Sequence, residues 1–285
     1  MIKCIAIDMD GTLLTAAQKV TEENIAAIKL AQSQGVEVVI ATGRSYQEAY
    51  FVLAGTGIDC PMICVNGAEV RNIKKEIIAE NPLNKTAVKA AIEILQRNDV
   101  YFEVYTNNGS YTIDEEKAVS VIVDIVLSAN PEMDAKEVET AARIRVTKGL
   151  VKKISDYEAI IQDEEHKVYK LLAFSFVEDK LRSAEKELHT VASLAVTTSA
   201  KSNLEVTAKD AQKGNALEKY VKESGISLQE TMAIGDNHND VSMFQIVGRA
   251  VAMGNASAEI KAQCDAVTLT NEESGVAKAI LEVLK

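Results

Sequence analysis

Short apolar runs alternate with helical segments in the first part of the chain, and this alternation is the feature that most restricts the fold. Residues 2–7, 36–42 and 61–68 are rich in Ile, Val and Ala, which is typical of strands buried on both faces. The segment 21–35 has Thr at its start, two Glu in its first turn and Gly at its end, so it predicts a helix. A second helix is expected to begin at Ser45, which opens the Ser-x-x-Glu spacing of a capping box. This βαβαβ order predicts a doubly wound parallel sheet.

The middle of the chain has a different pattern. Within residues 101–113, Asn108-Gly109 separates two β-rich runs, which predicts a hairpin. The other strand-like and helical segments of this region are expected at about 84–98, 115–129, 135–147, 167–176, 178–189 and 191–198. Hairpins mixed with helices indicate an antiparallel α+β layer.

The parallel pattern returns near the C-terminus. Strands are expected at 231–236, 250–254 and 265–269, with helices at 239–247 and 274–284. The fold class that follows is α/β, with a doubly wound, Rossmann-like parallel-sheet core and an inserted α+β domain.

We expect the inserted domain to interrupt the core once. The predicted boundaries place residues 1–82 and 204–285 in the core, and residues 83–203 in the α+β insertion.

The chain has 285 residues and a formal net charge of -11, which disfavours binding to nucleic acid or to an anionic membrane through bulk electrostatics. An anionic substrate would therefore need a local cation. No apolar run approaches the length of a membrane span, and the N-terminus leads directly into a strand-like run rather than a signal peptide. The four cysteines form no CxxC pair, so we expect free thiols in a cytoplasmic protein. No sequence feature sets an oligomeric state.

Acidic side chains follow two of the predicted parallel strands. Asp8 and Asp10 come after the first strand, and Asp236 follows the strand near residue 231. Ligands of open α/β sheets gather outside the carboxyl ends of the strands, so we expect these three carboxylates to share one edge. Like charges at such distances need a cation, and an oxygen-only donor set favours Mg²⁺.

Other groups at this edge suit a phosphate. Thr42 offers a hydroxyl, the backbone at Gly43 allows close approach, and Lys213 supplies a positive charge. An aspartate can attack phosphorus as a covalent nucleophile, and a second carboxylate can carry the proton. The spacing of Asp8 and Asp10 permits these two roles at one site.

These residues resemble the signatures of the haloacid dehalogenase-like superfamily. The segment 8–12, Asp-Met-Asp-Gly-Thr, is similar to the first signature, D-x-D-G-T. Thr42 matches the second signature, Lys213 the third, and the segment 235–240 the fourth. The insertion, with Asn-Gly-Ala at 66–68 ahead of it, is similar to the cap of the Cof-type phosphatases. The resemblance implies hydrolysis of phosphorylated sugars and other small phosphometabolites.

The resemblance also implies a role for each residue. Asp8 would be the nucleophile and Asp10 the general acid and base. Mg²⁺ would be held by Asp8, by the backbone carbonyl of Asp10 and by Asp236, while Asp240 would orient Lys213 or a metal-bound water. The residues implied to contact the phosphoryl group, or to hold the loop around it, are Thr42, Gly43, Arg44, Lys213 and Asn239.

The sequence therefore predicts a Mg²⁺-dependent phosphatase that forms an aspartyl-phosphate intermediate with a small phosphate ester. A phosphomutase on the same core is an alternative, and it would need to retain its product for rephosphorylation. A non-catalytic aspartate phosphoacceptor is another alternative. A metal-binding structural module would leave Thr42 and Lys213 unexplained. Specificity is expected to reside in the insertion.

Overall fold

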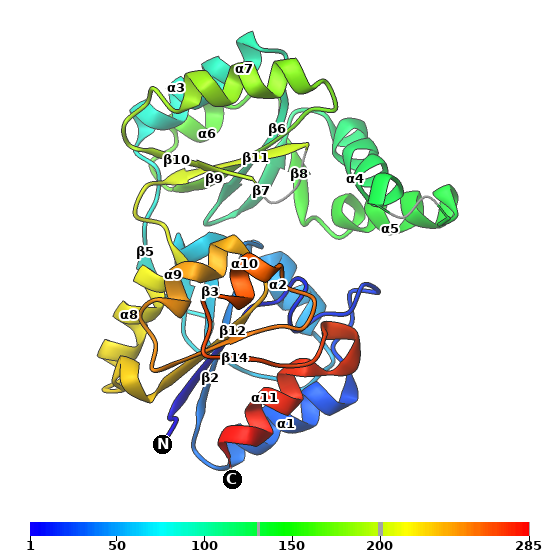
Figure 1. Cartoon of the computed structure of the whole chain (residues 1–285). Coiled ribbons are helices and arrows are strands. Elements are labelled where there is room, and N and C mark those ends of the chain that lie inside the picture. Colours follow the sequence, from blue (N-terminus) through cyan, green and yellow to red (C-terminus); the bar gives the residue numbers. More distant parts are fainter. Residues whose placement is uncertain (130–131, 199–201, 285) are drawn as a thin grey trace. The chain divides into compact units, whose positions relative to one another are not determined.

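The computed structural model describes residues 1–129, 132–198 and 202–284 and divides into two compact units (Figure 1). Unit 1 comprises Met1–Glu80 and Ala211–Lys285, and unit 2 comprises Asn81–Asp210.

Unit 1 is built on an eight-stranded sheet in the order β14-β13-β12-β1-β2-β3-β4-β5. Neighbouring strands from β14 to β3 run parallel, whereas β4 and β5 add an antiparallel edge that the sequence did not predict. The strands are β1 Cys4–Ile7, β2 Glu37–Ala41, β3 Met62–Cys64, β4 Glu69–Arg71, β5 Ile77–Glu80, β12 Thr231–Gly235, β13 Arg249–Ala252 and β14 Ala266–Val267.

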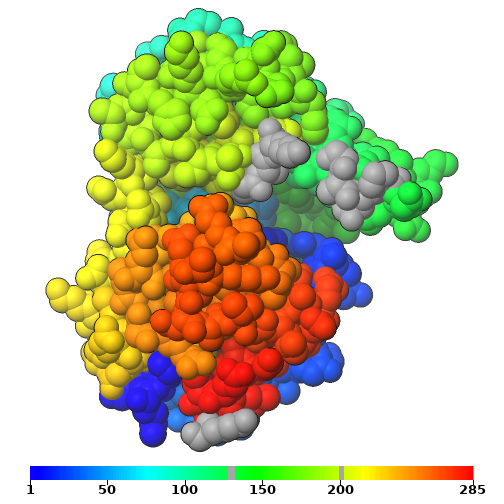
Figure 2. Space-filling model, in the orientation of Figure 1, coloured from blue at the N-terminus to red at the C-terminus, as the bar shows by residue number. Residues whose placement is uncertain are grey.

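Helices cover both faces of this sheet, which confirms the predicted doubly wound class (Figure 1). The α-helices of unit 1 are α1 Glu22–Ser33, α2 Tyr46–Leu53, α8 Lys213–Glu223, α9 Val241–Phe244, α10 Ala258–Lys261 and α11 Gly275–Val283. On one face, alternate residues of β1 and β2 pack against α8 and α9. All four residues of β1 are buried, so the other face is covered as well. In the space-filling view, the orange and red segments that include α10 and α11 form much of the visible surface of unit 1 (Figure 2).

Local sequence signals set the helix starts in unit 1. Thr21 caps α1 by accepting a hydrogen bond from the backbone N–H of Asn24, and Ser45 opens α2 with a capping box that includes Glu48. The helix predicted over 239–247 is shorter than expected, since a 3-10 turn precedes α9.

Unit 2 contains a six-stranded sheet in the order β10-β11-β9-β6-β7-β8. It is antiparallel except for the parallel pair β7-β8. Its strands are β6 Tyr101–Thr106, β7 Gly109–Thr112, β8 Val151–Lys153, β9 Val168–Phe174, β10 Leu194–Thr197 and β11 Asn203–Ala208. Its helices are α3 Lys85–Arg97, α4 Glu115–Ala129, α5 Ala135–Thr147, α6 Glu158–Gln162 and α7 Glu178–Leu188. This antiparallel sheet with helices confirms the predicted α+β class of the insertion.

Two details of unit 2 differ from the sequence prediction. The second stretch of unit 1 begins at Ala211 rather than at residue 204, because β11 pairs with β9 and β10 inside the sheet of unit 2. The hairpin turn consists of Asn107 and Asn108, since Gly109 already pairs with Thr106 as the first residue of β7.

Among the described residues, no helix is long and apolar enough to cross a membrane.

Candidate active site

Three polar side chains follow adjacent parallel strands of unit 1. Asp8 comes directly after β1, Thr42 after β2 and Asp236 after β12. Because β1 pairs with β12 on one side and with β2 on the other, the three residues lie at one edge of the sheet. This is the edge at which ligands of open α/β sheets bind.

Lys213, the first residue of α8, is fully buried beside this edge. Its Nζ donates hydrogen bonds to Oδ1 of Asp8 at 2.6 Å and to Oδ1 of Asp240 at 2.7 Å. Oδ2 of Asp240 accepts from the backbone N–H groups of Asp236 at 3.0 Å and Asn237 at 3.1 Å. Asp240 therefore fixes both the lysine and the loop that carries Asp236.

Asp8, Asp236 and Asp240 form a group that we call the carboxylate cluster. Each offers one oxygen, and these oxygens lie within 4.8 Å of one another. Burial and then repulsion from Asp240 raise the pKa of Asp8 well above its usual value. The same causes raise the pKa of Asp236 to about 6. Burial alone would lower the pKa of Lys213, but Asp240 and Asp8 outweigh it and raise that pKa.

The cluster thus sets three carboxylates against one ammonium group. A divalent cation would compensate the remaining negative charge, and an all-oxygen donor set suits a hard cation. The residues present therefore fit a metal ion.

Asp10 does not add its carboxylate to the cluster. Its side chain is 49% exposed, and its two oxygens accept hydrogen bonds from Arg44, one of them from Nε at 2.7 Å. The guanidinium of Arg44 also donates to the side chain of Gln18. The predicted metal set of Asp8, Asp10 and Asp236 thus brings two carboxylates together, with Asp240 as the third carboxylate of the cluster.

The residues expected near the phosphoryl group surround the end of β2. Thr42 is buried, and its hydroxyl oxygen accepts from the backbone N–H of Arg44 at 3.1 Å. Asn239 donates from Nδ2 to Oδ1 of Asn66 at 3.1 Å, and a Cβ added to Gly43 would lie 3.1 Å from that same oxygen. Asn66 was not predicted as a site residue. The sequence signal that could have identified Asn66 is its position after β3, the strand next to β2.

Two glycines allow the acidic loops to approach closely. A Cβ on Gly11 would lie 2.4 Å from Oδ2 of Asp236, and Gly11 has a φ of 77°. A Cβ on Gly235 would lie 2.4 Å from Oδ2 of Asp240. Thr12 then donates from Oγ1 to Oδ1 of Asp236 at 3.0 Å. Both glycines are required by space at the site.

The loop after β1 is also tied to the C-terminal part of the chain. Asn255 donates from Nδ2 to the carbonyl of Gly11 at 2.8 Å, and its Oδ1 accepts from the backbone N–H of Asn271 at 3.0 Å. Asn271 in turn donates from Nδ2 to the carbonyl of Leu14 at 2.8 Å. The sequence predicted neither asparagine, since each lies more than 240 residues from the loop that it holds.

Comparisons with known proteins show the family of this chain. The model of the haloacid dehalogenase-like hydrolase family matches residues 5–280. The chain is 35% identical to the phosphatase YwpJ of Bacillus subtilis (strain 168) over 285 residues, covering 99% of this chain and 100% of that protein. It is 37% identical over 284 residues to the 5-amino-6-(5-phospho-D-ribitylamino)uracil phosphatase YwtE of the same strain, covering 99% and 98%. A solved haloacid dehalogenase-like hydrolase from B. subtilis has a TM-score of 0.88 at 35% identity, covering 99% of this chain and 100% of that chain.

The chain therefore belongs to the haloacid dehalogenase-like hydrolases, as its sequence signatures indicate. Within that superfamily it is a Cof-type phosphatase, and the named relatives are phosphatases as well. The predicted enzyme class is thereby confirmed.

Proposed function

We propose that this protein is a Mg²⁺-dependent phosphatase that acts on small phosphorylated metabolites through a phosphoryl group carried on Asp8. The observation that carries the proposal is the buried contact of 2.6 Å between Asp8 and Lys213 inside the carboxylate cluster. A nucleophilic carboxylate beside a cation at the ligand edge of a sheet suits phosphoryl transfer.

The chemistry divides between Asp8 and Asp10. An oxygen of Asp8 forms a bond to phosphorus while the bond from phosphorus to the ester oxygen breaks, and Asp10 protonates that leaving oxygen. Water then attacks phosphorus, its proton passes to Asp10, and the bond to Asp8 breaks to release inorganic phosphate. To reach the leaving oxygen, Asp10 has to exchange its contact with Arg44.

The surrounding residues bind and orient the phosphoryl group. Mg²⁺, when bound, would offset the charge of the phosphate oxygens, and its holders would be Asp8, the backbone carbonyl of Asp10, and Asp236. Lys213 keeps Asp8 in place and Asp240 keeps Lys213 in place. We assign the phosphoryl contacts to Thr42, Gly43, Arg44, Lys213 and Asn239.

Small sugar phosphates and related compounds are the proposed substrates. The support is YwtE, whose name states a phospho-D-ribitylamino uracil substrate and which is 37% identical to this chain. We assign unit 2 as the cap domain that the sequence predicts. The free cysteines of the chain are consistent with the reducing cytoplasm, which we include in the proposal.

The test is a screen of phosphorylated metabolites with Mg²⁺, in which released phosphate is measured for the wild type and for Asp8→Asn. We expect Asp8→Asn to lower kcat by roughly 10⁴-fold, because the nucleophile is lost. The exposed Asp59→Asn in the same unit is the matched control and should be unchanged. Full turnover by Asp8→Asn would overturn the covalent mechanism, and an isomerised phosphate ester without free phosphate would favour a mutase.

A further inference from the structure

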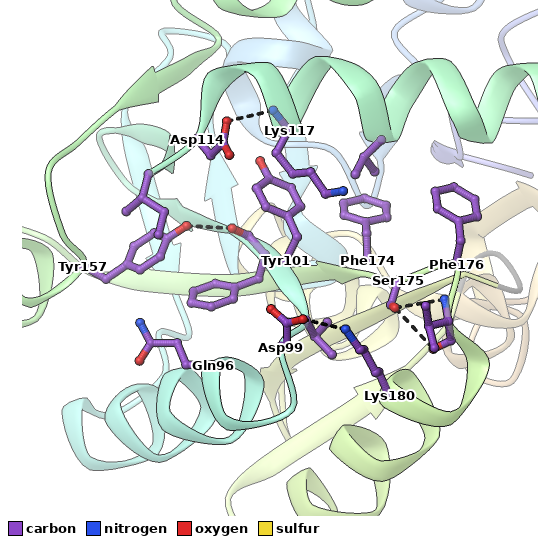
Figure 3. A pocket seen from close by; sticks show the side chains of 15 residues that line it. Gln96, Asp99, Tyr101, Asp114, Lys117, Tyr157, Phe174, Ser175, Phe176 and Lys180 are labelled. Carbon is purple, nitrogen blue, oxygen red and sulfur yellow. Dashed lines mark hydrogen bonds and ion pairs between the residues drawn. The ribbon is translucent and has the colours of Figure 1, made fainter.

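Unit 2 contains a cavity of about 510 Å³ that the phosphatase reaction does not explain (Figure 3). It lies where the start of β6 and the end of β9 meet the first turns of α4 and α7. All of its lining residues belong to unit 2, whereas the carboxylate cluster belongs to unit 1. Its volume is in the range of small-molecule sites, roughly 300–1,000 Å³.

Aromatic rings dominate the lining. Three of the five phenylalanines of the whole chain lie here, although the cavity involves a small part of the molecule. The aromatic lining residues are Tyr101, Phe102, Tyr157, Phe174 and Phe176.

The two tyrosine hydroxyls already have partners within unit 2. Oη of Tyr157 donates to the carbonyl of Phe102 at 2.7 Å, and Oη of Tyr101 lies 2.9 Å from the hydroxyl of Thr112. The rings of Phe102 and Tyr157 also stack, with centroids 4.6 Å apart. The tyrosines therefore offer the cavity mainly ring surface, which suits a flat apolar ligand.

The lining contains two acids and two lysines. Asp99 pairs with Lys180 at 2.5 Å, and Asp114 accepts from the backbone N–H of Lys117 at 3.0 Å. In the described parts of the chain, no hydrogen bond or ion pair involves the ammonium of Lys117. Figure 3 shows its side chain extending from α4 toward the rings of Tyr101 and Phe174. Although its charge helps Lys180 to lower the pKa of Asp99, the ammonium of Lys117 is the one that extends toward the rings, where it can meet an anionic group of a ligand.

The rim of the cavity exposes apolar side chains to solvent. Phe176 is 51% exposed, Val177 52% and Ile113 42%. Exposed apolar groups gathered around a hollow are typical of binding sites rather than of bare surface.

We propose that this cavity binds a flat aromatic molecule that carries a negative charge. The ring packs among Tyr101, Phe174 and Phe176, and the anionic group meets Lys117. Two sources share this chemistry, the phosphatase's own substrate and a separate small molecule. The first source rests on the proposed function, and the second does not.

The probe is 8-anilinonaphthalene-1-sulfonate, a flat aromatic anion, compared with the uncharged N-phenyl-1-naphthylamine. Both are titrated by fluorescence into the full-length protein without phosphate ester. Lys117→Met should weaken the sulfonate about fivefold, as expected for an ion pair at a partly exposed rim, and leave the uncharged probe unchanged. Phe176→Ala should weaken both probes by a few fold, because both lose ring contact.

Matched controls come from α5, whose residues do not line the cavity. Lys136→Met and Ile144→Ala remove an exposed lysine and an exposed apolar side chain from the same unit, and neither should change binding. Lys117 and Phe176 are themselves exposed, so their variants should fold, which circular dichroism checks. Failure of both probes to bind, or binding that ignores both Lys117→Met and Phe176→Ala, would overturn the proposal.

A measurement of phosphatase activity distinguishes the substrate from a separate small molecule as the ligand of the cavity. Phosphate release is measured with and without saturating sulfonate probe. An increase in KM alone assigns the cavity to the substrate, and any other result assigns it to a separate ligand. Since the binding titration requires no turnover, failure of this inference is distinguishable from failure of the proposed phosphatase reaction.

Discussion

Each unit of the molecule buries a cluster of charged side chains, and the two clusters differ in their charge balance. In unit 1, the carboxylate cluster has three acids, and Lys213 forms ion pairs with two of them, Asp8 and Asp240. In unit 2, Glu103 pairs with Arg145 at 2.9 Å, and Lys170 pairs with Glu205 at 3.4 Å, so each acid has its own base.

The numbers of acids and bases show whether each cluster needs a bound cation. The pairs of unit 2 neutralise each other, and the hydroxyls of Tyr101 and Tyr105 add hydrogen bonds to Glu103. In unit 1, burial and then repulsion from Asp240 raise the pKa values of Asp8 and Asp236. A buried cluster with more acids than bases indicates a cation site. A buried cluster in which every acid pairs with a base needs no bound ion and is explained by its role in packing.

Removal of divalent cations should have the largest effect. We expect EDTA to reduce phosphate release to background and Mg²⁺ to restore it, because the cluster of unit 1 lacks positive charge. Mg²⁺ should also stabilise the wild type by about 3 kcal/mol at a hundredfold excess over Kd, measured as a rise in Tm. Asp236→Asn should lose that rise, while Glu103→Gln in unit 2 should keep it. Unchanged turnover in the presence of EDTA would show that the unit 1 cluster needs no cation, and it would contradict the contrast between the two units.

Lys213→Met should have the second largest effect, since it removes the ammonium group that pairs with the unit 1 cluster. We expect kcat to fall by about 10²–10³-fold, as when one preorganised electrostatic group is lost. The free energy of unfolding should fall by about 3 kcal/mol, because buried carboxylates lose their partner. Lys219→Met, an exposed lysine on the same helix, is the control for activity and for denaturant unfolding. A Lys213→Met enzyme with wild-type kcat would show that Lys213 is only structural.

Arg145→Met tests the balanced cluster of unit 2. We expect it to lower the free energy of unfolding by about 3 kcal/mol, because Glu103 is left buried beside fewer donors. The double variant Glu103→Gln/Arg145→Met should recover much of this loss in urea unfolding, since no buried charge remains unpaired. kcat/KM should stay near the wild-type value in the folded double variant. A stable double variant without activity would place this cluster in the catalytic machinery and break the contrast.

Asn255→Ala should have the smallest effect, because Asn255 acts on the site only through the loop that carries Asp10. We expect kcat to fall about tenfold with little change in KM, since a small displacement of a catalytic group slows the reaction. Asn255→Asp keeps the acceptor for Asn271 but loses the donor to Gly11. If Asn255→Asp matches Asn255→Ala, the contact with Gly11 is the one that positions the loop. Wild-type kcat in both variants would exclude a positioning role.

Much of the fold could be predicted, because the apolar runs of unit 1 are long enough to specify buried parallel strands. The helices α4 and α5 were predicted with their observed bounds, since their residues have clear helical spacing. The antiparallel pair β4-β5 was not predicted, because strands of three and four residues carry too little periodicity. The strand β11 was not predicted, and the boundary at residue 204 placed most of its residues in the core, because a strand's partners are not local properties of its sequence.

The candidate site divides in the same way. Asp8, Thr42 and Asp236 could be placed at one edge from the sequence, because each ends a strand whose direction the βαβ order sets. Asn66 and Asn255 could not, since their roles depend on segments distant in sequence that meet only in the folded chain.

The sequence by itself determined the parallel core, its acidic edge and the family signatures, because hydrophobic runs and their terminal residues are encoded locally. Only the tertiary structure decided which charges meet. It turned the carboxylate of Asp10 toward Arg44, and it placed Asp240 against Lys213, one of the two roles that the resemblance implied for Asp240. The physical reason is that Coulomb and hydrogen-bond energies depend on distances of a few ångströms. The packing of the loops sets these distances, and the spacing of the strands along the sequence does not.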